Sequence, residues 1–554
     1  MRPRILAPIV WAFGLSIAGI ALHAADLRPP GLLPSRGVFD DTFDLRMRSD
    51  RTGGVVRFTR DGSFPTATHG ELASGPVSIS RTTVIRAVTV FEGTVSPVVT
   101  GSYLVPSSTV HQDGTGMPQS WGVREGRPLP AYYRMAPQEA VPGATTAEIR
   151  AALGALPSIS LVLPPEDLWS GSRGIYSNPQ ETGDGWERAA SLEILQVPGG
   201  EPVQIGCGLR MQGGWSRRPE ESPKHSFRLV FRKRYGAARF RYPLFGTGAD
   251  EFATLILRGG NNNSWLHPAS EERRRAEYLR DAWMRDSYAA LGHPASRGRF
   301  VHLYLNGRYW GIYQATERPD AHFAASRFGG TASDYDARNA DKIIEGDDAA
   351  WKQLFAVANA GIRSEADYGR IEALLDLPAF IDFILLNLYG ANADWDRGSN
   401  WYAGRRRTPS GPWRFFEWDG ERTLETVTDN RLGTDDDESP MRLFQRLRGY
   451  APFVQAFGAR AKIVLGEGGL LSPASAAARY RKLADGLGPA IAAEAARWGA
   501  YRREVAPFRT GPYEIYTRET HWRPEVDRLL KDYFPVRTAE AARQWREAGL
   551  LGLK

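Results

Sequence analysis

The first part of the chain contains short apolar runs that are separated by turn residues. Runs rich in β-branched residues recur at intervals of about ten residues between positions 53 and 105, and such spacing with turn signals predicts a small all-β sandwich. Its clearest strands are expected at 55–59, 83–90 and 98–103. We assign residues 45–106 to this domain. Residues 26–44 contain Pro and Gly with little periodicity, and they are predicted to be a linker.

Residues 107–154 are rich in Ser, Pro and Gly and predict a second linker. Alternation of apolar and polar residues resumes after this segment and predicts further strands. These strands are expected at 156–163, 190–195, 203–211, 226–231 and 254–257. Residues 300–305 and 309–315 flank Asn306-Gly307, a pair that favours the type I′ turn of a β-hairpin.

The pattern becomes helical after residue 376. The apolar run Phe380–Leu388 predicts a buried helix that ends at Gly390. Further helices, rich in Ala, Leu and Arg, are expected at 451–464, 473–487, 491–503 and 524–533. Strands first and helices second indicate an α+β domain over residues 155–430, with a helical extension over residues 431–554. The length of 554 residues agrees with a multidomain protein.

The composition is that of an ordinary soluble globular protein, with 42% hydrophobic and 24% charged residues. The net charge is +7 and the pI is near 9.3, but the densest basic runs, 273–275 and 405–407, are short. A nucleic-acid-binding protein concentrates such an excess in one patch. We therefore expect no nucleic-acid partner, whereas anionic substrates such as nucleotides are compatible with the charge.

The N-terminus has a charged head, an apolar run over residues 5–22 and small residues before Asp26. This order is typical of a secretory signal over residues 1–25 that is cleaved just before Asp26. An uncleaved anchor is the alternative, because about 18 apolar residues approach the length of a membrane span. With no second segment of this kind, we expect an exported protein without a membrane span after cleavage. The single cysteine, Cys207, is expected to be a buried thiol.

Acids and amides lie between aromatic residues in two stretches, 389–402 and 413–421. The first stretch follows the predicted buried helix, so its polar residues should lie on a loop beside the core. Carboxylate and amide oxygens suit Mg²⁺, which prefers one or two carboxylates together with substrate phosphates. Asp-Gly and Gly-Ser are also ordinary turn formers, and Asp419-Gly420 could simply close a hairpin. From the residues alone, both interpretations remain open.

A glycine pair, Gly213-Gly214, precedes Lys224. A turn followed by a strand lysine can cover a phosphate tail with backbone and meet it with a point charge. Taken alone, Lys224 is better explained as a surface residue at a strand edge, because Phe227 and Leu229 share a face that Lys224 does not. A carboxylate at Glu317 could pair with Lys224 and orient it, although such a residue at a hairpin end more often forms a weak surface ion pair.

Ordered phrases along the chain resemble two known families. Residues 53–105 resemble the chitobiase/β-hexosaminidase C-terminal domain, a β-sandwich accessory module, through Phe58–Thr66, Gly75–Ser80 and Thr82–Ala87. From Leu156 onwards the chain resembles the CotH kinase family, named from a spore-coat protein. The phrases that carry this second resemblance are 206–213, 223–228, 242–246, 255–259, 279–281, 304–313, 317–318, 392–395 and 413–419.

The CotH resemblance implies a divergent protein-kinase-like fold that uses ATP and Mg²⁺ to phosphorylate proteins. By position, it implies that Asp394 is the catalytic base and that Lys224, with Glu317 as its ion-pair partner, contacts the phosphates. The other implied site residues are Gly213 and Gly214 at the nucleotide, and Asp419, Asn400 and Glu421 at the metal. The family phrase Asp-Trp-Pro reads Asp394-Trp395-Asp396 here, and the asparagine that follows is displaced.

These features lead to two hypotheses. The first is an exported CotH-like atypical protein kinase that transfers the ATP γ-phosphate to Ser or Thr of envelope or secreted proteins. The alternative is a catalytically inactive kinase-like surface protein that binds a partner or a glycan through the sandwich and the aromatic loops. Carbohydrate hydrolysis by an Asp394/Asp419 pair is disfavoured, because the surrounding phrases match the kinase family.

Overall fold

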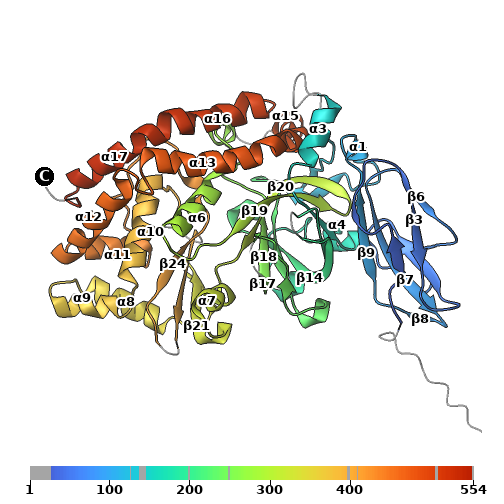
Figure 1. Cartoon of the computed structure of the whole chain (residues 1–554), viewed down its shortest axis with the longest axis horizontal. Coiled ribbons are helices and arrows are strands. Elements are labelled where there is room, and N and C mark those ends of the chain that lie inside the picture. The colour runs from blue at the N-terminus through green and yellow to red at the C-terminus, as the bar shows by residue number, and fades with distance from the viewer. Residues whose placement is uncertain are drawn as a thin grey trace, which may run out of the picture.

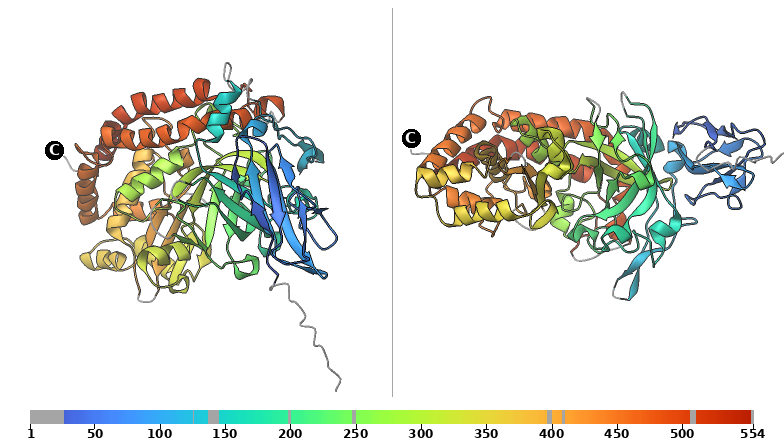
Figure 2. Two further views of the ribbon diagram at one scale, coloured as in Figure 1. Left: turned by 45° about the vertical axis from the view of Figure 1, so that its right-hand side comes forward. Right: turned by 90° about the horizontal axis from the view of Figure 1, so that it is seen from below.

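A computed structural model describes residues 27–124, 126–136, 145–197, 200–246, 250–395, 400–407, 410–505 and 510–551. The predicted signal segment, residues 1–25, and Asp396 lie outside the described residues. Three parts follow one another in space, namely an N-terminal all-β part, a β-barrel and a helix-rich part (Figures 1 and 2). The predicted multidomain order of sandwich, α+β domain and helical extension is confirmed.

The N-terminal part consists of two small sheets packed on a common core. One sheet contains β1 (Gly31–Leu33), β3 (Phe43–Arg48) and β6 (Val77–Ile79); the other contains β2 (Gly37–Val38), β9 (Val99–Leu104), β7 (Thr83–Phe91), β4 (Val55–Thr59) and β5 (Glu71–Leu72), with β8 (Thr94–Val95) paired to β7. Leu45, Phe58, Ile85 and Tyr103 are buried between them. The predicted linker 26–44 is wrong, because it contributes β1, β2 and the start of β3.

A closed seven-stranded barrel forms the first half of the next domain. Its strands in order are β12 (Ser158–Val162), β13 (Arg188–Leu195), β14 (Val203–Gln212), β15 (Ser226–Val230), β18 (Thr254–Arg258), β20 (Arg308–Glu317) and β19 (Gly298–Leu305). The β19–β20 hairpin turns at Asn306 and Gly307, which have φ of 46° and 75°, as a type I′ turn requires. Cys207 is buried in the barrel core, and burial beside Glu187 raises its pKa to about 12.

The second predicted linker is also wrong. Residues 107–154 contain most of α1 (Pro106–Thr109), the hairpin of β10 (Ser120–Arg124) and β11 (Arg127–Pro130), and α3 (Thr146–Leu153). Trp121 and Tyr133 are buried in the barrel core, where Trp121 Nε1 donates a hydrogen bond of 2.8 Å to the Tyr133 hydroxyl. The local Ser, Pro and Gly content indicated a linker, whereas the aromatic residues of this segment pack against residues that are distant in the sequence.

A four-stranded antiparallel sheet faces the barrel from the helix-rich part. It contains β22 (Lys342–Glu345), β21 (Tyr335–Asn339), β23 (Trp401–Arg406) and β24 (Arg414–Glu417). The helices around the barrel and this sheet are α4 (Pro165–Trp169), α5 (Ser270–Arg274), α6 (Arg280–Ala290), α7 (Ala321–Phe328), α8 (Ala349–Asn359), α9 (Glu365–Glu372) and α10 (Leu377–Gly390). Two short strands, β16 (Phe240–Arg241) and β17 (Glu251–Phe252), pair with each other beside the barrel. Every residue of α10 except Pro378 is buried, which confirms the predicted buried helix ending at Gly390.

The C-terminal part is helical, as predicted. Its helices are α11 (Pro440–Leu447), α12 (Ala451–Leu465), α13 (Pro473–Leu487), α14 (Ile491–Trp498), α15 (Tyr501–Glu504), α16 (Arg523–Arg528) and α17 (Phe534–Glu547). Helices α13, α16 and α17 run along one side of the molecule (Figure 1), whereas α14 packs against β20 of the barrel. Within the described ranges, no helix is both long and apolar enough to span a bilayer.

Candidate functional site

A cavity of about 690 Å³ lies between the barrel and the four-stranded sheet. Its walls come from β14, β15 and β18 on one side and from β21, β22, β23 and the end of β24 on the other. Six of the eight predicted site residues line it, namely Gly213, Gly214, Asp394, Asn400, Asp419 and Glu421. The size falls in the range of roughly 300–1,000 Å³ that is common for small-molecule sites.

The fold brings Asp394 and Asn400 together at the end of α10. Ala391 adopts a left-handed conformation with φ of 50° and ends the helix, so the chain turns toward the cavity. The Asp394 amide donates to Asn392 Oδ1 at 3.2 Å, and Asn400 Nδ2 donates to the Asp394 carbonyl at 2.5 Å. These bonds hold the loop at both ends, on either side of residues 396–399, which are not described.

Strand register places Asp419 beside this loop. In the antiparallel pair of β23 and β24, Trp401 lies opposite Glu417, so the start of one strand and the end of the other meet at the same edge. Asp419 has a φ of 64° and opens a short 3₁₀ helix, Gly420–Arg422. The Gly420 amide donates to Asp281 Oδ1 of α6 at 3.0 Å. Asp419-Gly420 is therefore a turn, and this turn directs an acid into the cavity.

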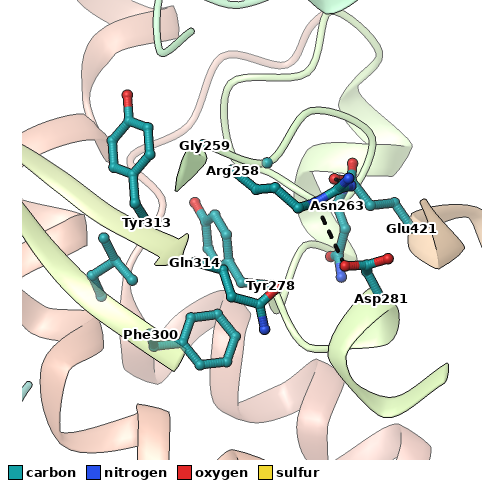
Figure 3. A pocket seen from close by; sticks show the side chains of 11 residues that line it. Arg258, Gly259, Asn263, Tyr278, Asp281, Phe300, Tyr313, Gln314 and Glu421 are labelled. Carbon is teal, nitrogen blue, oxygen red and sulfur yellow. Dashed lines mark hydrogen bonds and ion pairs between the residues drawn. The ribbon is translucent and has the colours of Figure 1, made fainter. Parts of the chain in front are cut away.

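Arg258, at the end of β18, connects the carboxylates of the site. Its guanidinium donates to Asp419 Oδ1 at 2.6 Å and to Glu421 Oε1 at 2.8 Å, and it lies 3.5 Å from Asp281 Oδ2. Figure 3 shows Arg258 reaching toward Glu421 and Asp281 beside a smaller cavity of about 30 Å³. Arg258 was not among the predicted site residues. The local pattern does not mark it, because Leu255, Ile256 and Leu257 before it are all buried.

The charges of this cluster explain the pKa shifts in it. Burial and the neighbouring Glu421 and Asp281 carboxylates raise the pKa of Asp419, Arg258 lowers it, and the resulting pKa is about 6. Burial opposes charge on Arg258 as well, but the three carboxylates outweigh it and hold the pKa of Arg258 well above its usual value. Arg258 faces three carboxylates and Arg285 also pairs with Asp281 at 3.1 Å, so carboxylates outnumber guanidiniums by three to two at this end of the cavity.

The donor set around Asp419 has the chemistry that Mg²⁺ prefers, because carboxylate and amide oxygens are hard ligands. Only Oδ1 of Asp419 bonds to a described residue, and Asn400 lines the same cavity. Glu421 is less available to a metal than Asp419, because its Oε2 accepts hydrogen bonds from the backbone amides of Asn261 and Asn262 at 3.0 and 2.7 Å. Among the described residues, no group of three or more His, Cys, Asp or Glu is arranged as a preformed metal site.

The predicted ion pair between Lys224 and Glu317 does not form. Lys224 Nζ lies 2.5 Å from Glu494 Oε1 of α14, and both side chains are fully buried. Glu317 instead accepts hydrogen bonds from Arg297 at 2.7 Å and from Arg327 at 2.8 Å. Neither Lys224 nor Glu317 lines the cavity. The local pattern could not reveal this, because Glu494 is 270 residues away in the chain.

Gly213 occupies a position that requires glycine. Its φ is 117°, and an added Cβ would lie 2.5 Å from Ser216 Oγ. The turn Gly213-Gly214 follows β14 and lines the cavity opposite the acidic loop. Trp215 follows it and is 54% exposed, with the Arg218 guanidinium stacked on its ring at 3.4 Å.

A glycine turn, a strand cation and a buried helix that leads into an acidic loop define a kinase-like protein, here preceded by an accessory β-sandwich. Residues 209–539 match the family model for CotH kinase protein. This match covers more than half of the chain, and the protein belongs to the CotH kinase family. Residues 34–100 match the chitobiase/beta-hexosaminidase C-terminal domain. Both predicted resemblances are thereby confirmed. A search of curated proteins found no match.

Proposed function

We propose that the protein is an exported protein kinase that uses ATP and Mg²⁺ to phosphorylate Ser or Thr residues of envelope or secreted proteins. The observation that carries this proposal is the convergence of Asp394, Asn400 and Asp419 on one cavity, opposite the Gly213-Gly214 turn. Family membership supports a kinase-like protein. Export is proposed from the apolar N-terminal segment, residues 5–22.

In this proposal Asp394 is the catalytic base. It accepts the proton of a Ser or Thr hydroxyl as that oxygen attacks the γ-phosphorus, and the bond from phosphorus to the β–γ bridging oxygen breaks to release ADP. Asp419 and Asn400 are the residues that would hold Mg²⁺, and the metal would neutralise charge on the phosphate oxygens. Because positioning and charge neutralisation supply most of the catalysis in phosphoryl transfer, few residues are needed.

We assign to Arg258 and Asp281 the roles that the CotH resemblance implied for Lys224 and Glu317. In protein kinases the lysine lies on the strand after the glycine-loop hairpin, and its glutamate partner lies on the helix that follows. Here the next barrel strand after the β14–β15 pair is β18 with Arg258, which β16 and β17 precede in the chain, and α6 with Asp281 follows β18 after the short α5. The ion pair of 3.5 Å between them supports this assignment.

Radiolabelled ATP with Mg²⁺ tests the proposal on the purified protein and on protein fractions from the envelope and culture medium. We expect Asp394→Asn to lower label incorporation by about 10²–10⁴-fold, and Asp419→Asn and Arg258→Gln to lower it by at least about 10²-fold. Asp527→Asn is the matched control, because Asp527 is 47% exposed and pairs only with Lys531 on the surface. Equal incorporation by wild type, Asp394→Asn and Asp419→Asn would overturn the proposal.

A further inference from the structure

The cavity contains a second group of charges that the proposed phosphotransfer does not use. Arg228 of β15 and Arg318, which follows β20, both line it, together with Lys342 of β22. The two arginines are half-buried. Arg228 on β15 and Arg318 just after β20 thus place two cations at the wall of the cavity.

Arg228 has no acidic partner among the described residues. Its Nε donates to Gln212 Oε1 at 2.8 Å, and Gln212 directly precedes the Gly213-Gly214 turn. Burial, followed by repulsion from Arg318, lowers the pKa of Arg228 to about 10. The two guanidiniums are thus close enough to oppose each other, and burial of like charges is unfavourable without a counter-ion.

Arg318 has no close carboxylate partner among the described residues, although Tyr402 and Asp320 offset its burial and raise its pKa. Its closest carboxylate oxygen is Asp320 Oδ2 at 3.9 Å, and its Nε lies 3.4 Å from the Tyr402 hydroxyl. Asp320 uses its other oxygen to accept the His322 amide at 3.0 Å at the start of α7. An anion placed between the two arginines would therefore meet guanidinium groups that no described carboxylate engages closely.

The two arginines are separated from the acidic end by aromatic rings. The Arg258 guanidinium lies 4.9 Å from the Trp418 ring, Trp418 contacts Tyr402 at 5.4 Å, and Tyr402 lies 5.9 Å from Arg318. Neither Arg228 nor Arg318 pairs with Asp419 or Glu421. The cavity thus has an anionic end, suited to a cation, and a cationic wall, suited to an anion.

We infer that Arg228 and Arg318 form an anion subsite that binds a phosphate group of the nucleotide. Guanidinium groups recognise phosphate through paired, charge-assisted hydrogen bonds, and the bond from Arg228 to Gln212 places this subsite next to the glycine turn. The inference deepens the proposed function, on which it rests for the identity of the ligand. Lys224, which the resemblance would place at the phosphates, pairs with Glu494 and is buried outside the cavity.

Magnesium-free binding tests the subsite without any phosphotransfer. The dissociation constants of tripolyphosphate, ATP and adenosine are measured by calorimetry for wild type, Arg228→Gln, Arg318→Gln and the control Arg241→Gln. Arg241 is 76% exposed on β16, pairs with Glu251 and does not line the cavity. We expect each cavity variant to bind tripolyphosphate and ATP about tenfold or more weakly, with adenosine unchanged and with the control like wild type.

The alternatives give distinct results. Unchanged tripolyphosphate affinity in both cavity variants, or no tripolyphosphate binding by wild type, overturns the subsite. If the affinity for adenosine falls by the same factor as the affinity for tripolyphosphate, the arginines contact the base, and this result also overturns the phosphate subsite. Arg228→Lys and Arg318→Lys keep the charge and should retain part of the affinity, which separates the subsite from misfolding. Phosphate-dependent binding without label transfer by wild type would leave the subsite intact and remove the kinase proposal.

Discussion

Lys224 Nζ and Glu494 Oε1 lie 2.5 Å apart, with both side chains fully buried. Lys224 precedes β15 of the barrel, and Glu494 belongs to α14, near the end of the chain. The second oxygen of Glu494 accepts the Ile312 amide of β20 at 2.6 Å. The helical C-terminal part is therefore joined to the barrel through a buried ion pair and a strand amide.

Lys224→Met should destabilise the protein strongly, because it leaves the buried Glu494 carboxylate without its partner, a loss of roughly 3–5 kcal/mol in comparable pairs. Lys224→Met combined with Glu494→Gln should regain much of this loss, since the amide still accepts from Ile312. Urea unfolding of the single and double variants measures the difference. Lys352→Met is the control, because Lys352 is 67% exposed.

The same double variant separates a structural role from nucleotide contact. If Lys224 stabilises the fold only, the double variant binds ATP with the affinity of wild type. An ATP affinity lowered about tenfold or more in a variant that unfolds at the wild-type urea concentration would instead return Lys224 to the nucleotide site.

Gly213→Ala should weaken nucleotide binding. The positive φ of 117° and the approach of 2.5 Å to Ser216 Oγ oppose a side chain, at a cost of about 1–3 kcal/mol for such backbone strain. Because the turn lines the cavity, its displacement should reduce ATP affinity, measured by calorimetry. Gly171→Ala is the matched control, because Gly171 lies outside the left-handed region and its added Cβ would meet no atom within 4 Å. Equal ATP affinity for both variants would contradict the role assigned to the turn.

Much of this fold could be predicted from local patterns. The strands predicted at 203–211 and 254–257 and the helix at 473–487 agree closely with β14, β18 and α13, because each is a regular element whose apolar period reflects burial. The predicted linkers failed for the opposite reason. Their strands and aromatic anchors are short, and their burial depends on partners that are distant in sequence, such as Trp310 beside Trp121.

The site was predictable to a similar extent. Asp394 and Asn400 follow a buried helix and Asp419 follows a buried strand, but this pattern left a turn and a metal site both open, and the CotH resemblance supplied the roles. The partners of a charged residue are different, because nothing in the local sequence of Lys224 indicates Glu494. For the same reason Arg258 was not recognised as the cation that joins Asp419, Glu421 and Asp281.

The Asp382 carboxylate should make stability depend on acid pH. Asp382 of α10 is buried and accepts hydrogen bonds from Arg460 at 2.7 Å and contacts His293 at 2.7 Å. Burial alone would raise its pKa, but these partners outweigh burial and hold the pKa below the usual 3.8. A depressed carboxyl pKa gives stability that is complete above the unfolded-state value and is lost as the pH falls through the folded-state value.

We therefore expect Asp382→Asn to lower the free energy of unfolding at pH 7 by about 1–3 kcal/mol, measured by urea unfolding. The difference should shrink as the pH falls below 3.8, where the wild-type carboxyl is protonated as well. Asp527→Asn, in an exposed pair with Lys531, should change stability by less than about 1 kcal/mol across the same range. A pH-independent difference for Asp382→Asn would show that its effect comes from packing and not from charge.

The β-sandwich should be coupled to the barrel through Glu193. This carboxylate of β13 is fully buried and accepts Arg36 Nε at 2.7 Å, the Ser102 amide at 3.2 Å and the Ser102 hydroxyl. The Ser102 hydroxyl also contacts Ser160 Oγ of β12 at 2.7 Å. Arg36 and Ser102 belong to the sandwich, so the buried Glu193 carboxylate joins the two domains. Among the described residues, the strands of the sandwich and of the barrel pair only within their own domain.

Arg36→Met should uncouple these domains, because it leaves the Glu193 charge buried with fewer partners and weakens the interface on both sides. Calorimetric unfolding is expected to change from one transition to two, with the sandwich melting first since it has the smaller core. Arg28→Met is the control, because Arg28 is in the same domain but is 83% exposed and lies 3.8 Å from Asp50. A single transition retained in Arg36→Met would mean that the remaining contacts suffice, and a fixed sandwich would then extend the surface that a protein substrate meets.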